Sequence, residues 1–211
     1  MVADPGLVEL KSNAEKGDAT SQVNLGVLYA NGQNVEKDYE EAVKWFLRAA
    51  GQGHVMAQFN LGIVYANGQG VEKDPAESLK WYRKAADQGL AAAQFTCGSL
   101  YDAGLGTKKD PAEAVTWYRK AADQGHAMAQ FNLGAAYNNG EGVAKDLVEA
   151  YAWINLAVRS MAEKASFRDD LEKAMSSQQV TAAQRRTKAL KSQIESKANE
   201  PKPGAPKASG K

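Results

Sequence analysis

Residues 54–89 read HVMAQFNLGIVYANGQGVEKDPAESLKWYRKAADQG, and this 36-residue pattern occurs four times in the chain. The four tryptophans, at positions 45, 81, 117 and 153, are separated by the same interval. The copies span residues 18–53, 54–89, 90–125 and 126–160. Repetition at a fixed period of this length is typical of proteins built from stacked supersecondary units. The positions that hold the same residue in all four copies are, in the second copy, Gln58, Gly62, Tyr65, Gly68, Lys73, Asp74, Glu77, Trp81 and Ala85.

Each copy predicts two helices. In the second copy Ala57, Leu61 and Tyr65 recur at i, i+4 and i+8, which places them on one face of a first helix, called helix A below. Gly68 follows as a residue that ends helices without steric cost. The sequence Asp74-Pro75-Ala76-Glu77 then has the pattern of a capping box with proline in the first turn, which predicts the start of a second helix, helix B.

Helix B also has one apolar face, formed in the second copy by Ser78, Trp81, Tyr82 and Ala85. Because neither helix of a pair can bury its apolar face alone, neighbouring copies must stack on one another. The sequence therefore predicts an all-α fold, a right-handed α/α superhelical solenoid of four 36-residue repeats with helical caps.

The segments outside the repeats predict caps and a tail. Residues 1–17 predict an N-terminal capping helix, residues 18–160 hold the four repeats, and residues 161–196 predict two C-terminal capping helices that are broken near Ser176-Ser177. One of these serines or Thr181 is expected to cap the second. Residues 197–211 contain three of the six prolines and no large apolar residue, so they predict a disordered Lys/Pro/Ala tail.

Composition excludes several classes of protein. The 211 residues are 44% hydrophobic and 24% charged with net charge +1, as in a folded globular protein, and a single cysteine excludes an intrachain disulfide. No Cys/His cluster has zinc-ligand spacing, and no apolar run reaches the roughly 20 residues of a membrane span. The first residues lack a signal-peptide pattern. The default expectation is a cytoplasmic protein, or a periplasmic one if a leader has been removed.

The run Ala57–Gly62, followed by Tyr65, Gly68, Asp74 and Trp81, closely resembles the Sel-1-like repeat (SLR), a relative of the tetratricopeptide repeat. The resemblance covers residues 18–160 and implies an adaptor that holds other proteins together, often in bacteria, without shared catalytic residues. A cysteine-rich branch of the family includes members described as β-lactamase-like. Because this chain has only Cys97 and no Ser-x-x-Lys motif, that activity is the least favoured interpretation.

No residue pattern points to catalysis, to a cofactor or to a metal. His54 and His126 are expected to pack where helix A begins, since they are 72 residues apart. Cys97 replaces a core leucine and is expected to act as a small apolar residue. The Gly-x-Gly pairs follow helices and are interpreted as turns, while the invariant Asp and Glu are explained by capping. We therefore expect a protein that is not an enzyme.

Binding is predicted on the helix A surface. By analogy with tetratricopeptide units, the A helices line a concave groove that suits an extended peptide or a partner helix. We hypothesise that Asn24, Asn60 and Asn132 bind the partner's backbone, whereas recurring phenylalanines are more often core than contact. The predicted partner-binding residues are Asn24, Asn31, Phe59, Asn60, Ile63, Asn67, Phe95, Thr96, Asp102, Phe131, Asn132 and Asn139.

Charge gives an alternative function. Residues 161–211 have 11 Lys/Arg against 6 Asp/Glu, whereas residues 1–160 have 15 against 19. A basic tail is able to bind nucleic acid or an anionic membrane through phosphate charge. The tail has no aromatic residue for base stacking, however, and its lysines are interleaved with proline, so a solvated linker is favoured. The preferred prediction remains a protein or peptide partner.

Overall fold

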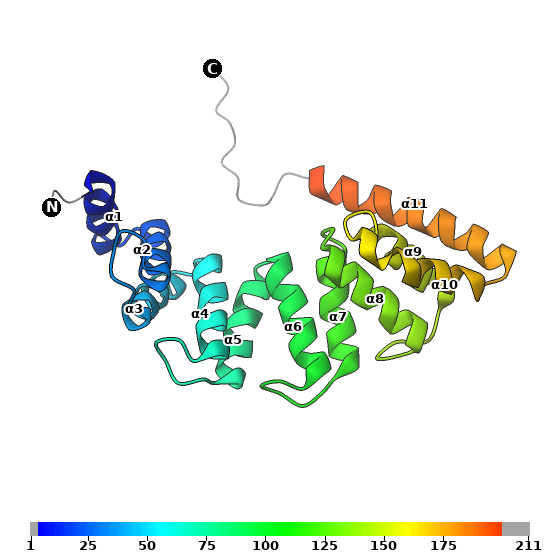
Figure 1. Ribbon diagram of the computed structural model, residues 1–211, viewed down its shortest axis with the longest axis horizontal. Helices are drawn as coiled ribbons and strands as arrows, with labels where there is room; N and C mark the ends of the chain where they lie inside the picture. Colours follow the sequence, from blue (N-terminus) through cyan, green and yellow to red (C-terminus); the bar gives the residue numbers. More distant parts are fainter. Residues whose placement is uncertain (1–3, 200–211) are drawn as a thin grey trace, which may run out of the picture. The chain divides into compact units, whose positions relative to one another are not determined.

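The computed structural model describes residues 4–199, and these residues form helices without any strand among them. The chain divides into two compact units between Trp117 and Tyr118. The first unit contains α1 (Pro5–Glu15), α2 (Ala19–Asn31), α3 (Tyr39–Gly51), α4 (Val55–Asn67), α5 (Pro75–Asp87), α6 (Ala91–Ala103) and the start of α7 (Pro111–Ala122). The second contains the end of α7, α8 (Ala127–Asn139), α9 (Leu147–Ala157), the 3-10 helix η1 (Ala162–Lys164), α10 (Ala165–Lys173) and α11 (Ser177–Asn199) (Figure 1). The predicted all-α class is confirmed.

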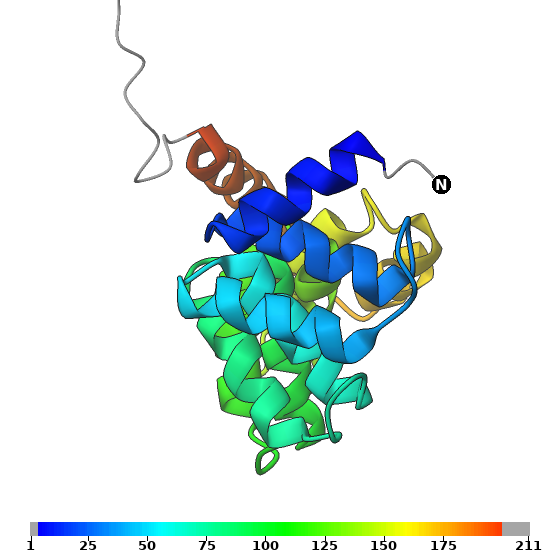
Figure 2. The same cartoon turned by 90° about the vertical axis from the view of Figure 1, so that its left-hand side faces the viewer.

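Helix A and helix B of a repeat pack side by side, as α2 with α3 and α4 with α5 in the first unit and α8 with α9 in the second. In the first unit α3 also packs on α4 and α5 on α6, while α1 covers α2 (Figure 2). Neighbouring repeats therefore share a core, in which Phe46, Leu61 and Val64 are almost completely buried. Glycine at position 62 makes room for helix B of the same repeat, because a Cβ built there would lie 2.6 Å from the ring of Tyr82.

Each B helix begins at the predicted aspartate. Asp74 Oδ1 accepts hydrogen bonds from the N–H groups of Ala76 and Glu77, both at 2.9 Å, and the equivalent aspartates cap the other three B helices. In a capping box the glutamate side chain also accepts a hydrogen bond from the N–H of the capping residue, and this part of the prediction is wrong. The N–H of Asp74 donates to the carbonyl oxygen of Tyr65 at 3.0 Å, so the Glu77 side chain has no donor to accept from there and pairs with Lys80 at 2.8 Å.

This invariant glutamate has different partners in different repeats. Where Glu77 pairs with Lys80, the indole N–H of Trp81 is buried without a hydrogen-bond partner among the described residues. The fourth repeat has alanine in place of the lysine, and there Glu149 accepts a hydrogen bond from Trp153 Nε1 at 3.1 Å. In the first repeat the glutamate again pairs with a lysine and the tryptophan N–H is again without a partner, as in the second. In the third repeat, as in the fourth, the glutamate accepts a hydrogen bond from the tryptophan N–H. A lysine three residues after the glutamate therefore removes the acceptor of the tryptophan.

In the first unit, the glutamine just after helix B bonds to the turn that precedes its own repeat and to a glutamine of helix A. Gln88, just after α5, donates from Nε2 to the carbonyl oxygen of Gly53 at 2.9 Å and to the side-chain oxygen of Gln58 at 2.7 Å. Gln52 makes the equivalent two bonds one repeat earlier. Gln58 is buried, and a buried amide needs a hydrogen-bond partner. This need explains why every copy has glutamine at the position of Gln58.

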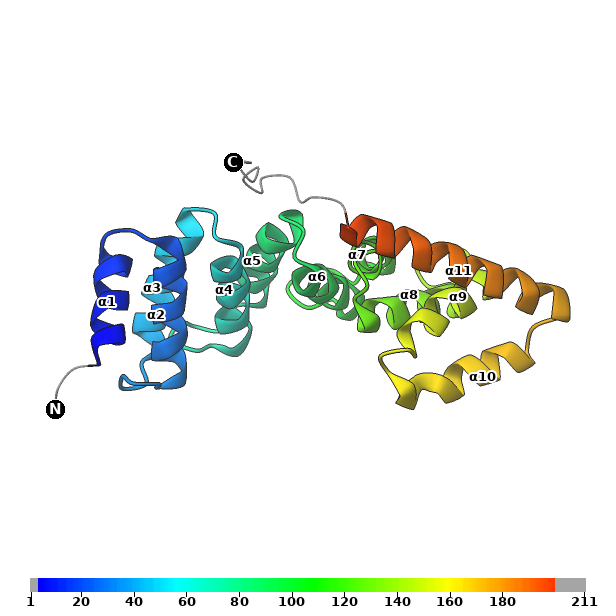
Figure 3. The ribbon, with the colours of Figure 1, turned by 90° about the horizontal axis from the view of Figure 1, so that it is seen from above.

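After the fourth repeat, α10 and α11 diverge from a turn at residues 174–176, where the break was predicted (Figure 3). Ser176 caps α11, because its Oγ accepts from the N–H of Gln179 at 3.3 Å and Gln179 Oε1 accepts from the N–H of Ser176 at 2.9 Å. α11 packs on α9, where Arg186 pairs with Glu149 at 2.5 Å. α11 includes residues 197–199, which were predicted to belong to the disordered tail. The rest of that predicted tail lies outside the described residues.

Candidate functional site

A hollow of about 320 Å³ lies between α2 and α4 in the first unit. Side chains of α2 and α4 form its walls together with two from α3 and one from the loop after α4. We call it the α2–α4 hollow, and its lining residues are Val27, Ala30, Asn31, Tyr39, Phe46, Asn60, Ile63, Val64 and Gln69. None of these side chains is charged at neutral pH, so the hollow suits a neutral group with apolar and amide character.

Two amides in the α2–α4 hollow are available for binding. The side chains of Asn31 and Asn60 make no hydrogen bond within the described part of the chain, and each offers two N–H donors and a carbonyl acceptor. The other polar pair is already satisfied, since Gln69 Nε2 donates to the hydroxyl oxygen of Tyr39 at 2.9 Å. The hollow therefore combines free amides with the apolar surface of Val27 and its neighbours.

Three of the predicted partner-binding residues, Asn31, Asn60 and Ile63, come together in this hollow. Asn24 is exposed on α2 outside the set of lining residues. Asn67 is exposed at the end of α4, and its Nδ2 donates to the Gln69 side chain at 3.5 Å.

The predicted residues of the third and fourth repeats are spread over α6 and α8. Phe95 and Thr96 are half-buried, and the Thr96 hydroxyl donates to the carbonyl oxygen four residues earlier at 2.8 Å, so it is used within its own helix. Asp102 is exposed near the end of α6. On α8, Asn132 is half-buried and Asn139 is exposed. These side chains line none of the hollows described here.

Two predicted phenylalanines have aromatic neighbours within the chain. Phe59 lies edge-on to Tyr82 of its own repeat, with ring centroids 5.3 Å apart. Phe131 lies edge-on to Phe167 of α10 at 5.4 Å, and Lys164 Nζ is 5.2 Å from the Phe131 centroid. Both phenylalanines are half-buried, so each has a packing role and still presents an edge to solvent.

Sequence reasoning missed Tyr39 and Gln69. Tyr39 is the first residue of α3, a position where the second and third repeats have Pro75 and Pro111. The tyrosine in place of proline was the sequence signal that could have identified this residue. Gln69 gave no signal, because a polar residue between two loop positions is ordinary, and only the packing of one repeat on the next places it beside Tyr39.

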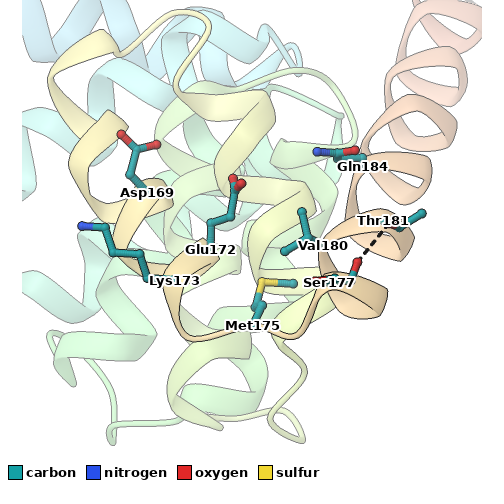
Figure 4. A pocket seen from close by; sticks show the side chains of 8 residues that line it. All are labelled: Asp169, Glu172, Lys173, Met175, Ser177, Val180, Thr181 and Gln184. Atoms are coloured by element: carbon teal, nitrogen blue, oxygen red, sulfur yellow. Dashed lines mark hydrogen bonds between the residues drawn. The ribbon is translucent and has the colours of Figure 1, made fainter.

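A second hollow of about 750 Å³ lies between α10 and α11 (Figure 4). It is wide, and its ionised side chains already have partners. Glu172 accepts a hydrogen bond from the hydroxyl of Tyr151 at 2.8 Å, and Lys173 pairs with Asp170 at 2.8 Å. Burial raises the pKa of Tyr151 to about 12, with the Glu172 hydrogen bond acting in the same direction. The α2–α4 hollow, with its free amides, is therefore the stronger candidate site.

The residues weighed for chemistry have structural roles. His54 and His126 are the N-cap residues of α4 and α8. His126 Nδ1 accepts a hydrogen bond from the N–H of Ala129 at 3.3 Å, and burial lowers the pKa of its imidazole. The Nδ1 of His54 is buried without a hydrogen-bond partner among the described residues. Cys97 is fully buried. Over residues 4–199, no cluster of three His, Cys, Asp or Glu is placed to hold a metal ion. In the same range no helix combines the length and apolar character needed to cross a membrane.

A family model for the Sel1 repeat matches residues 19–54, 55–90, 91–126 and 127–160. The chain therefore belongs to the Sel1 repeat family, and the resemblance seen in the sequence is confirmed. Proteins of this family are typically protein–protein interaction modules and are generally non-enzymatic scaffolds.

Two solved structures are similar to this chain. A Sel1 repeat protein from Oxalobacter formigenes is 40% identical with a TM-score of 0.70, over 73% of this chain and 63% of that one. A protective antigen present in uropathogenic Escherichia coli strains, which displays an SLR fold, is 27% identical with a TM-score of 0.57, over 97% of this chain and 53% of that one. This chain thus spans less than two thirds of either relative. No curated protein matches it.

Proposed function

We propose that this chain is a non-enzymatic scaffold or adaptor that binds a segment of a partner protein on its A helices. The α2–α4 hollow is the proposed centre of binding in the first unit, and the other predicted residues of α2, α4, α6 and α8 are further contacts. The proposed division of labour assigns residues 18–160 to binding and residues 1–17 and 161–196 to capping the array.

The free amides of Asn31 and Asn60 beside an apolar wall are the observation that supports this proposal. A buried amide that loses water without gaining a partner costs about 1–3 kcal/mol, so a ligand that covers these groups must supply donors and acceptors. A peptide main chain or the polar side chains of a partner helix supply both. An apolar side chain of the same partner is expected to fill the space beside Val27 and Ile63.

Selection of random displayed peptides on the purified chain tests this function. Peptides that are retained are titrated by calorimetry against the wild type and against the double variant Asn31→Ala/Asn60→Ala. We expect at least about a tenfold loss of affinity, equivalent to about 1.4 kcal/mol. Gln193→Ala is the control, because it truncates an exposed amide side chain on α11, outside the proposed binding residues. Equal affinities for the double variant and the control would contradict the proposed site.

The backbone hypothesis needs its own variant. The triple variant Asn24→Ala/Asn60→Ala/Asn132→Ala removes the equivalent amide from three A helices. If all three bind one partner, its affinity should fall further than in Asn60→Ala alone. An effect equal to that of Asn60→Ala would restrict the contact to the α2–α4 hollow.

A further inference from the structure

Helix α10 packs on helix B of the fourth repeat, α9, and its Phe167 also reaches helix A, α8. Phe167 of α10 is edge-on to Phe131 of α8, with centroids 5.4 Å apart, and Lys164, the residue before α10, places its Nζ 5.2 Å from the same ring centroid. Phe131 is a predicted partner-binding residue. The chain therefore places one of its own helices on a surface predicted for a partner.

A difference between repeats accounts for this contact. Phe59 finds its aromatic neighbour, Tyr82, on helix B of the same repeat. In the fourth repeat the position of Tyr82 is occupied by Ile154, which is fully buried. Phe131 instead makes its aromatic contact with Phe167 of α10, at a typical edge-to-face distance.

The anchors of this segment have the spacing of a docked helix. Phe167 and Leu171 stand at i and i+4 on one face of α10, and Lys164, the last residue of η1, comes three positions before Phe167. Leu171 is only 6% exposed and is the one buried residue of α10. Anchors at this spacing are how an amphipathic helix binds a groove.

Few contacts hold α10 in place. It has nine residues, whereas isolated helices shorter than about 12–15 residues are marginal in water, so its helical state depends on docking. Phe167 is still 37% exposed, and the ion pairs of Arg168 with Asp169 and of Lys173 with Asp170 lie within α10 itself. One hydrogen bond, from the Tyr151 hydroxyl of α9 to Glu172, joins α10 to the fourth repeat, whereas α11 packs more extensively on α9 and is joined to it by the Arg186–Glu149 pair.

We propose that α10 is a displaceable strap on the fourth repeat, and that the partner replacing it is an amphipathic helix with the same anchors. Those anchors are a lysine, an aromatic residue three positions later and a leucine four positions after that. This inference rests on the proposed function for the existence of a partner protein. It adds that the segment of the partner bound by the fourth repeat is a helix. In the chain without a partner, α10 covers Phe131, and the binding of such a helix displaces it.

A fluorescein-labelled synthetic peptide with the sequence of residues 161–175 is the probe, titrated by anisotropy against the full chain. Because Phe167 is partly exposed, Phe167→Ala should loosen the strap without unfolding the repeats. We expect this variant to bind the peptide at least about tenfold more tightly than the wild type, since a tethered competitor has an effective concentration in the millimolar range. Adding Phe131→Ala should remove the gain, and a peptide with alanine in place of its phenylalanine is the matched control.

Equal peptide affinities for the wild type and Phe167→Ala, or a gain that survives Phe131→Ala, would overturn the strap. If Phe167→Ala does not fold, amide hydrogen exchange of the unmodified chain decides instead. A strap requires α10 amides to exchange at least about 100-fold faster than those of α9, as locally opening segments do, and equal protection would overturn it. If the strap test fails but the selected peptides still need Asn31 and Asn60 to bind, the strap proposal is wrong and the proposed function is unaffected. If the strap test fails and the selected peptides bind without these asparagines, both proposals are contradicted.

Discussion

Replacing Gly70 with alanine tests how the loop of one repeat holds the repeat before it. Gly70 has a φ of +71° and lies against the start of α3. A Cβ built on it would overlap the carbonyl group of Tyr39 and lie 2.7 Å from the main-chain nitrogen of Glu40. These obstacles are main-chain atoms at a helix start, so they are unable to rotate away as a side chain would.

Two costs add in this variant. A non-glycine residue in the left-handed region costs about 1–2 kcal/mol, and overpacking typically adds about 1–3 kcal/mol. We therefore expect Gly70→Ala to lower the free energy of unfolding by about 2–5 kcal/mol. In a chain of this size each kcal/mol shifts the melting temperature by about 2–4 °C.

Gly53→Ala is the matched control. Gly53 has a φ of +84°, but no atom lies within 4 Å of a Cβ built on it, so this variant pays only the conformational cost. Urea denaturation followed by far-UV circular dichroism measures both variants. Gly70→Ala should be less stable than Gly53→Ala by at least about 1 kcal/mol. Equal stabilities would refute the reasoning, because they would mean that the loop moves away from α3 without cost.

Three other features of the repeats lead to further predictions. Gln88→Ala removes one side-chain hydrogen bond to Gly53 of the first repeat and one to the buried Gln58 of its own repeat, and should cost about 1–2 kcal/mol in urea denaturation; a loss no greater than that of the exposed Gln193→Ala would contradict it. Lys80→Thr, which copies the third repeat, should free Glu77 to accept from the Trp81 indole N–H, and its proton resonance should then move downfield; an unmoved resonance would disprove the competition. Burial raises the pKa of Tyr82 from 10.0 to about 12, so the neutral phenol is favoured in the folded chain. Its stabilising contribution is complete below pH 10 and is lost as the pH rises through about 12, so stability should fall less over this range in Tyr82→Phe than in the wild type.

The helices and their starts were predictable from the sequence because their causes are local. Asp74 accepts hydrogen bonds from the N–H groups of Ala76 and Glu77, two and three positions later, and a contact this short depends little on the rest of the fold. The second role given to Glu77 failed because Tyr65, nine positions before Asp74, already accepts the N–H of Asp74.

The candidate site was predictable only in part. The analogy with tetratricopeptide units predicted Asn31, Asn60 and Ile63 on the binding surface of the A helices, and the structure brings them together in the α2–α4 hollow. Tyr39 and Gln69 come from helix B and a loop of adjacent repeats, and their hydrogen bond joins residues 30 positions apart. No local pattern predicts such a pair.

The sequence by itself determined the period, the helix pairs and the need for neighbouring repeats to stack, since each of these follows from local capping, helical spacing and the cost of exposing an apolar face. Only the tertiary structure decided which side chains share a contact. In the folded chain Glu77 pairs with Lys80 and not with Trp81. The amides of Asn31 and Asn60 have no partner among the described residues, and Phe167 packs edge-on against Phe131. Each of these outcomes depends on which groups the packed helices bring within reach of one another, and this is a property of the tertiary arrangement.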